Sequence, residues 1–238
     1  MITTVLTVMD RLDYLSSQLK AIRSQSIDTK ILIHWNRKDN YTLDYPAIVY
    51  RNQHKSAPLY NRFISSLNID TPYVFICDDD ILPGKKYLER CVNFLENNDA
   101  CIVNYGMIFG KDSSDYNVVE RIDHQAYLKK PRQVDMGGQG YFFKTKLLRK
   151  YCDYKIHDSK WGEDIHLGYI CYKENIPTYV LDSDRNDIDT WQDMSVGQRG
   201  VDESAQWRYP THKPVRDKLV NIYSKLGWEF KLANPSII

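Results

Sequence analysis

The sequence predicts an α/β fold in which an open, mostly parallel sheet is flanked by helices on both faces. Its first half alternates apolar, strand-like runs with amphipathic helical segments, as chains built from βαβ units do. The run YVFIC at residues 73–77 is apolar throughout, which is typical of a strand buried on both faces. Three consecutive aspartates, Asp78, Asp79 and Asp80, follow this run directly, so the predicted central strand ends in a strongly acidic segment.

Apolar periodicity and turn residues set the elements of the first half. The expected strands are residues 3–9, 30–35, 47–50, 73–77 and 100–105. The expected helices are residues 12–25, residues 57–67 and a third that begins near Pro83. Leucine and isoleucine recur at helical spacing in the first helix, and Pro58 suits the first turn of the second.

The second half is less regular. Residues 106–134 are expected to form a polar loop region, followed by a glycine-rich segment that contains Gly137, Gly138 and Gly140, an aromatic strand and a short helix. The glycines allow the backbone to approach a ligand or to turn sharply. A helix is expected at 161–176, a long loop at 182–211 and a last helix at PVRDKLVNIYSKLG. Without an internal repeat, the chain is expected to form one domain, residues 1–238.

Composition favours a soluble, intracellular protein. The chain has 238 residues, 42% hydrophobic and 26% charged, which is ordinary for a globular protein. The N-terminal segment has no basic leader, and no window reaches the roughly 18 apolar residues of a membrane span. Five cysteines without a CxxC pair argue against a disulfide framework or a cysteine zinc site. A cytoplasmic location is therefore expected. If the protein is encoded by a phage, this would be the cytoplasm of the host.

The aspartate triplet is the first candidate site. Three adjacent like charges are unfavourable unless a cation, hydrogen-bond donors or solvent offsets them. A solvated turn is the simple explanation, since aspartate is common in turns. However, ligands of open α/β sheets bind at the carboxyl ends of the strands, where Asp78–Asp80 are expected. Oxygen ligands there suit Mg²⁺ or Mn²⁺ bridging to a substrate diphosphate.

A second acidic pair, Glu163 and Asp164, lies in the first turn of the predicted helix 161–176. Acidic residues at that position also favour the helix dipole, so helix capping alone is a sufficient reason for them. Two reactions suit a metal-bound diphosphate at a sheet edge: nucleotidyl transfer and sugar transfer from a nucleotide-sugar. Because the first strand ends in VMDRLDYL rather than in a glycine-rich basic loop, sugar transfer is favoured. A nucleotidyltransferase and a catalytically silent nucleotide-sugar-binding module remain alternatives.

Six short segments occur in an order that resembles one enzyme family. They are DRLDYL after the first strand, HWN after the second, NRF sixteen residues before the triplet, GGQGYFF, GEDIHLGYI, and the HKPVR that contains His212 and Arg216. This pattern resembles the GT-A glycosyltransferases, and in detail their exostosin-like members. The resemblance extends over most of the chain and implies the nucleotide-diphospho-sugar transferase (GT-A) fold, with residues 1–105 binding the nucleotide-sugar and residues 106–238 the acceptor.

The resemblance also implies roles for individual residues. Asp80 would ligate Mn²⁺ or Mg²⁺, Asp79 would contact the donor sugar, and Asp78 would contact the ribose or a metal-bound water. Three residues, Arg11, Asn36 and Arg62, would hold the nucleotide. Asp164, with Glu163, would face the reacting sugar and the acceptor hydroxyl. Arg216 would stabilise the departing diphosphate. His212 would be a further metal ligand, unless its role is only structural. The implied donor is a UDP-sugar, and the implied outcome is retention at the anomeric carbon, although Asp164 also suits an inverting general base.

The sequence departs from the family pattern in two ways. Ala57 stands where the family tends to carry an asparagine for the nucleotide, and the signal anchor and luminal cysteines of the animal enzymes are missing. The acceptor therefore cannot be inherited from the resemblance. Two acceptors are considered: a bacterial or capsule-type glycan, and a hydroxymethylated base in DNA.

The DNA acceptor rests on basic and aromatic residues of the second half. These are the basic run 129–160, the aromatics Tyr141, Phe142, Tyr151, Tyr154 and Trp161, and the loop arginines Arg185, Arg199 and Arg208. Enzymes that modify a base flip it out of the duplex and stack it on aromatics, and phosphate contacts make binding salt-dependent. The simpler explanation is that these aromatics belong to the core and the lysines to a solvated surface.

Overall fold

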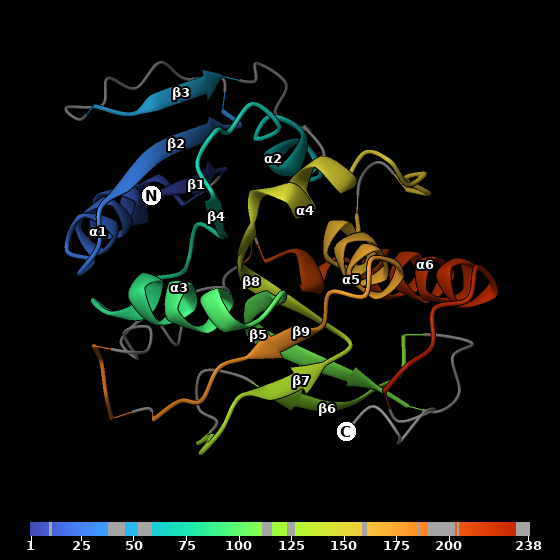
Figure 1. The fold of residues 1–238 in the computed structure, drawn as a ribbon. Coiled ribbons are helices and arrows are strands. Elements are labelled where there is room, and N and C mark those ends of the chain that lie inside the picture. Colours follow the sequence, from blue (N-terminus) through green and yellow to red (C-terminus); the bar gives the residue numbers. More distant parts are fainter. Residues whose placement is uncertain are drawn as a thin grey trace.

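The computed structural model describes residues 1–9, 11–37, 46–51, 59–110, 116–122, 127–158, 161–184, 186–189, 203 and 205–231. These form a nine-stranded sheet covered by helices on both faces (Figure 1), which confirms the predicted α/β class. The strands are β1 (Ile2–Val8), β2 (Thr29–Trp35), β3 (Ile48–Arg51), β4 (Tyr73–Cys77), β5 (Cys101–Phe109), β6 (Val118–Ile122), β7 (Arg132–Val134), β8 (Met136–Lys144) and β9 (Thr178–Val180). The helices are α1 (Leu12–Arg23), α2 (Asn61–Ile64), α3 (Tyr87–Asn97), α4 (Thr145–Lys150), α5 (Glu163–Lys173), the 3₁₀ turn η2 (Gln206–Arg208) and α6 (His212–Lys225).

The strand order is β3-β2-β1-β4-β8-β5-β9-β7, with β6 paired to β5. The strands of the first half form a parallel block in the order β3-β2-β1-β4. Each pair of neighbouring strands within this block is parallel. Strand β8 lies between β4 and β5 and is antiparallel to both. The parallel part of the sheet therefore places the carboxyl ends of β1, β2 and β4 at one edge.

Two apolar layers explain why β4 is apolar at every position. Val74 and Ile76 face the cluster formed with α2, α4 and α5, while Phe75 and Cys77 face the cluster formed with α1 and α3. Because side chains alternate along a strand, a strand covered on both faces needs apolar residues at successive positions. A third cluster packs α5 against α6 and the end of the chain around Tyr223 and Trp228.

Several predicted boundaries are wrong. The expected loop 106–134 contains the end of β5 together with β6 and β7, and the short strand β9 was not predicted. Strand β6 is a mostly exposed edge strand with charged residues, so its sequence lacks the alternation of a half-buried strand. Helix α3 begins at Tyr87 rather than near Pro83, because the carbonyls of Ile81 and Gly84 accept hydrogen bonds from the side chains of Gln18 and Gln25 instead. Helix α2 is shorter than residues 57–67, and Ala57 and Pro58 lie outside the described residues.

The glycines of β8 serve strand packing. A Cβ atom at Gly140 would lie 2.4 Å from Asn104 Oδ1 of β5, and one at Gly137 would lie 2.4 Å from Val103 Cβ. Contacts under 3.0 Å require the neighbour to move, so these positions let β8 lie close to β5. The glycines were expected to let the backbone approach a ligand or turn sharply. At Gly137 and Gly140 the backbone instead lies close to the neighbouring strand β5. In the described part of the chain, no helix has both the length and the apolar character needed to cross a membrane.

Candidate active site

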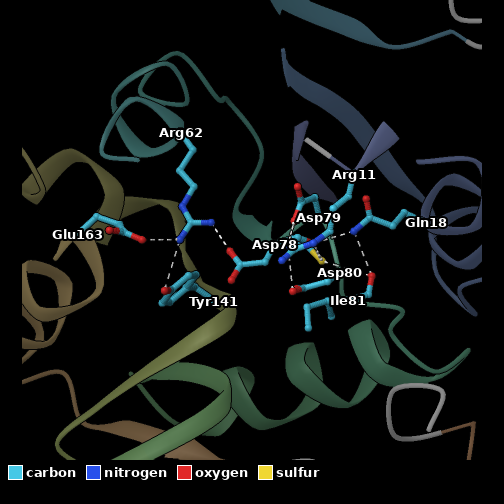
Figure 2. Close-up of polar contacts among 10 residues, drawn as sticks. Arg11, Gln18, Arg62, Asp78, Asp79, Asp80, Ile81, Tyr141 and Glu163 are labelled. Carbon is cyan, nitrogen blue, oxygen red and sulfur yellow. Dashed lines mark hydrogen bonds and ion pairs between the residues drawn. The ribbon is translucent and has the colours of Figure 1, made fainter. Parts of the chain in front are cut away.

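The aspartate triplet forms a tight turn at the carboxyl end of β4. The Ile81 amide donates to the Asp78 carbonyl at 3.4 Å, and the Asp78 amide donates to the Gln139 carbonyl of β8 at 2.8 Å. Gln18 of α1 donates to the carbonyl oxygens of both Asp78 and Ile81, at 2.6 and 3.1 Å (Figure 2). The predicted site at the sheet edge is therefore an ordered turn fixed by neighbouring elements.

Arg11, the residue directly before α1, neutralises part of this turn. Its Nη1 lies 2.5 Å from Asp79 Oδ1 and 3.1 Å from Asp80 Oδ2, and all three side chains are largely buried. Burial and the neighbouring Asp78 raise the pKa of Asp80 to about 7, and burial likewise raises the pKa of Asp79. Asp80 Oδ1 is buried with no hydrogen-bond partner in the described chain. One guanidinium does not fully compensate these two carboxylates.

Arg62 of α2 joins the turn to helix α5. Its Nη1 pairs with Asp78, its Nη2 donates to Glu163 Oε1 at 2.9 Å, and Tyr141 of β8 lies within 3.5 Å of the same Nη2 (Figure 2). The Arg62 side chain is 3% exposed and the Glu163 side chain 7%. Burial raises the pKa of Glu163 to about 7, and the Arg62 charge limits this rise. Arg62 was predicted to hold the nucleotide. In the structure its guanidinium is paired with Asp78 and Glu163.

Arg216 of α6 and Asp164 of α5 form a second buried pair. Arg216 donates twice to the Asp164 carboxylate, at 3.0 and 2.6 Å, in the bidentate arrangement that is the strong form of this contact. The Tyr116 ring lies 4.4 Å from the Arg216 guanidinium, and its hydroxyl accepts a hydrogen bond from Arg216 at 3.1 Å. The structure thus brings together Asp164 and Arg216, which are 52 residues apart in the chain.

Gly162 allows this pair to form. It precedes α5 with φ of +85°, a left-handed conformation that favours glycine. A Cβ atom here would lie 2.2 Å from Leu219 Cδ1 of α6. The missing side chain lets α6 pack directly on the start of α5, where Asp164 lies.

Asn36 lies just beyond the carboxyl end of β2. Its backbone amide donates to the Val8 carbonyl at 2.9 Å and so extends the hydrogen bonding between β2 and β1. The residue is 2% exposed. Both polar atoms of the Asn36 side chain are buried without partners among the described residues, as is His34 Nδ1, two positions earlier on the same face of the strand. Burial and the Arg62 charge lower the pKa of His34 to about 4. Buried polar atoms without partners are costly, and a ligand or bound water relieves that cost.

The predicted metal ligands do not converge. Asp78 pairs with Arg62, Asp80 pairs with Arg11, and the charges that act on His212 are those of Arg216 and Asp164. Within the described ranges, no three His, Cys, Asp or Glu side chains are grouped closely enough to hold a metal ion. Asp80, with its unpartnered oxygen and raised pKa, remains the carboxylate best suited to a cation.

Three residues of this site were missed in the sequence. Gln18 donates to the Asp78 carbonyl, and the Tyr116 hydroxyl accepts from Arg216. Gln139 has φ of +69°, and its backbone carbonyl accepts from the Asp78 amide. A polar residue within the apolar face of helix 12–25 was the available signal for Gln18. No local pattern marks the other two, because their partners are distant in sequence.

Most of the aromatics that suggested a DNA acceptor are in the core. Tyr141, Phe142 and Tyr151 are at most 2% exposed, so they are not available for stacking on a base. Trp161 is only partly buried and packs against Tyr209. Arg208 is exposed beside Trp207, while Arg185 and Arg199 lie outside the described residues.

Comparison with known proteins supports the fold and the enzyme class. Residues 2–117 match the glycosyl transferase family 64 domain, a stretch that includes Arg11, Asn36, Arg62 and the triplet but ends before α5. No curated protein sequence matches the chain.

Solved structures of the glycosyltransferase TarS from S. aureus share the fold. TarS 1-349 is 11% identical with a TM-score of 0.59, and the match covers 94% of this chain and 70% of that one. A second TarS structure is 14% identical with a TM-score of 0.57, and covers 94% and 42%. The family match supports a glycosyltransferase as the enzyme class, and the likeness to TarS supports the fold.

Proposed function

We propose that this chain is a metal-dependent glycosyltransferase that transfers a sugar from a nucleotide-sugar, with a UDP-sugar as donor, to an acceptor hydroxyl group. One observation carries the proposal. The ion pairs at the carboxyl end of the sheet contain five carboxylates and three guanidinium groups. The excess of two negative charges, when all are ionised, is one that a divalent cation would offset, at the edge where ligands of open α/β sheets bind.

Asp80 is the residue that would hold Mn²⁺ or Mg²⁺. Its Oδ1 atom has no partner in the described chain, and its pKa is raised first by burial and then by the neighbouring Asp78 charge. Mg²⁺ commonly uses one or two carboxylates together with substrate phosphates and water, so a set of three protein ligands is not needed. When bound, the cation neutralises charge on the departing diphosphate. Asp79, beside Asp80, would contact the donor sugar. His212 would be a further ligand of the cation.

Asn36 and Arg11 hold the nucleotide in this proposal. The Asn36 amide has an unpartnered donor and an unpartnered acceptor, which match the amide edge of a uracil ring. Arg11 lies between the turn and the start of α1 and has the fork geometry that binds phosphates. Arg62 orients Asp78 and Glu163 from its buried position.

Asp164 and Arg216 act at the reacting end. Arg216 stabilises the negative charge of the departing diphosphate, while Asp164 and Tyr116 fix the plane of its guanidinium. Asp164, with Glu163, faces the reacting sugar and the acceptor hydroxyl. The reaction retains the anomeric configuration, with the diphosphate helping to remove the acceptor proton. If the anomeric proton coupling of the product showed inversion, Asp164 would instead be the general base.

A glycan hydroxyl is the proposed acceptor. The burial of Tyr141, Phe142 and Tyr151 removes most of the stacking surface that a flipped base would need. Lysines of the basic run instead belong to a solvated surface, with Lys146 and Lys150 in exposed ion pairs.

The test is incorporation of labelled sugar from a panel of UDP-, GDP- and CMP-sugars with Mn²⁺, offered glycan acceptors or hydroxymethylated duplex DNA. Transfer from a UDP-sugar to a glycan is the expected result. Transfer to DNA would keep the enzyme class and replace the acceptor. Pyrophosphate release from UTP and a sugar phosphate would point to a nucleotidyltransferase, and binding without any transfer would point to a silent binding module.

A further inference from the structure

Gln18 holds the backbone of the aspartate turn. Its side chain is 1% exposed, and its Nε2 atom donates to the Asp78 carbonyl at 2.6 Å and the Ile81 carbonyl at 3.1 Å (Figure 2). A primary amide has two N–H groups. Both donors of Gln18 are therefore committed to the two residues that begin and end the turn.

The two carbonyls define how the carboxylates project. Because Asp79 and Asp80 are the central residues of the turn from Asp78 to Ile81, the separation of its ends sets the direction of both side chains. The Cys77 thiol lies 3.4 and 3.9 Å from the same carbonyl oxygens but is a weak donor. Gln18 is the strong side-chain donor at this point.

Arg11 and Gln18 act on different parts of the turn. They are two helical turns apart and approach it from the same side (Figure 2), but Arg11 contacts the carboxylates and Gln18 contacts the backbone. A cation competes with Arg11 for the carboxylates, and a diphosphate competes with the carboxylates for Arg11, whereas the carbonyls that Gln18 binds take part in neither exchange. The backbone contact therefore persists when a ligand enters.

We propose that Gln18 is a positioning residue that clamps the Asp78–Ile81 turn and so fixes the direction in which Asp80 meets a divalent cation, with Asp79 held beside it. The part of the inference that concerns the cation rests on the function proposed above. The clamp itself rests on the two hydrogen bonds to the turn and on the burial of the side chain.

Gln25, two residues beyond the end of α1, provides a matched control. It donates to the Gly84 carbonyl at 2.8 Å and accepts from the Leu88 amide at 3.1 Å. It fixes the segment that follows the turn without touching the aspartates. Gln18→Met and Gln25→Met each remove a side-chain amide while keeping a similar length and volume.

The experiment measures Mn²⁺ affinity by electron paramagnetic resonance and the hydrogen exchange rate of the Ile81 amide in the metal-free protein. We expect Gln18→Met to weaken Mn²⁺ binding by about tenfold or more, the usual effect of removing support behind a metal ligand, and to speed Ile81 exchange. Gln25→Met should retain the Mn²⁺ affinity of the wild type within about twofold, although it loses stability.

Equal Mn²⁺ affinity in Gln18→Met and the wild type would overturn the inference, as would equal losses in both variants. If the wild type binds no Mn²⁺, the metal part of the proposed function fails, and Ile81 exchange alone decides whether Gln18 clamps the turn. If Gln18→Met does not fold, Gln18→Asn replaces it. Its amide is one methylene shorter and cannot reach both carbonyls, so it should show the same loss of affinity.

Discussion

Arg62 Nη2 donates to Glu163 Oε1 at 2.9 Å, although the two residues are 101 positions apart in the chain. The same guanidinium pairs with Asp78 at the end of β4. A single buried cation thus connects the acidic turn of the first half to the acidic helix of the second half. Because removal of one partner leaves a buried charge uncompensated, this contact controls both stability and the arrangement of the site.

Replacing Arg62 should be strongly destabilising. We expect Arg62→Met to lower the free energy of unfolding by about 3–5 kcal/mol, because Glu163 would remain buried without its counter-ion. The double variant Arg62→Met/Glu163→Gln should recover part of that loss, since it removes the unpaired charge. Urea denaturation of the single and double variants measures both values. A double variant no more stable than Arg62→Met would contradict this account of the pair.

Gly162→Ala should disturb the site more than Gly227→Ala. Both glycines have positive φ, +85° and +91°, and a non-glycine residue there costs about 1–2 kcal/mol. At Gly162 the new Cβ would also meet Leu219 Cδ1, whereas at Gly227 no atom of the described chain lies within 4 Å. Thermal unfolding should therefore show a larger loss for Gly162→Ala, with reduced turnover in that variant alone. Equal losses would show that α5–α6 packing does not depend on Gly162.

Arg216→Lys should reduce turnover by at least about a hundredfold, the scale on which loss of one transition-state donor acts. Lysine keeps the charge but loses the bidentate contact with Asp164 and the stacking on Tyr116. The control is Lys213→Ala on the same helix, which breaks an exposed pair with Asp217 that is worth about 1 kcal/mol or less. Comparable turnover in both variants would exclude a role for Arg216 at the reacting end.

Stability should fall as the pH rises from about 4 to about 6, in part because of Asp135. Burial raises the pKa of Asp135 to about 6, although the Phe109 and Lys231 amides that donate to it lower the pKa part of the way. The ordinary value is about 3.9, so the folded protein binds more protons than the unfolded chain across this interval. The raised pKa values of Glu163 and Asp80 extend the same trend to about pH 7.

The variant Asp135→Asn tests this assignment because Asp135 lies away from the ion pairs of the site. Urea unfolding of the metal-free protein at several pH values should show a flatter profile between about pH 4 and pH 6 in the variant. An unchanged slope would show that Asp135 does not titrate as its burial implies.

The sequence was most informative where one local pattern has one structural solution. The continuous apolar run 73–77 identified β4 with its observed bounds, and the acidic residues after it lie at the carboxyl edge of the sheet as expected. The resemblance implied separate roles for Asp164 and Arg216, and no periodicity in the sequence predicted the ion pair between them. Edge strands such as β6 lack apolar alternation, so local patterns did not identify them.

The partners within the site could not be read from the sequence. Arg62 was expected at the nucleotide, but its position between Asp78 and Glu163 depends on how α2 and α5 pack across the sheet. Gln18 is a polar residue on a buried helix face, and its reason for being there appears only when the turn of β4 lies beside α1. Such contacts between distant segments are set by tertiary packing.

The most direct test of the central claim is release of the nucleoside diphosphate from a UDP-sugar with and without Mn²⁺, compared between the wild type and Asp80→Asn. Asp80→Asn keeps the shape of the side chain and removes the carboxylate that would hold the cation. The account predicts release that requires Mn²⁺ and is lost in Asp80→Asn, while Asp70→Asn, which changes an exposed aspartate three residues before β4, behaves as the wild type. Release that proceeds equally without Mn²⁺ and in Asp80→Asn, or no release from any donor, would contradict it.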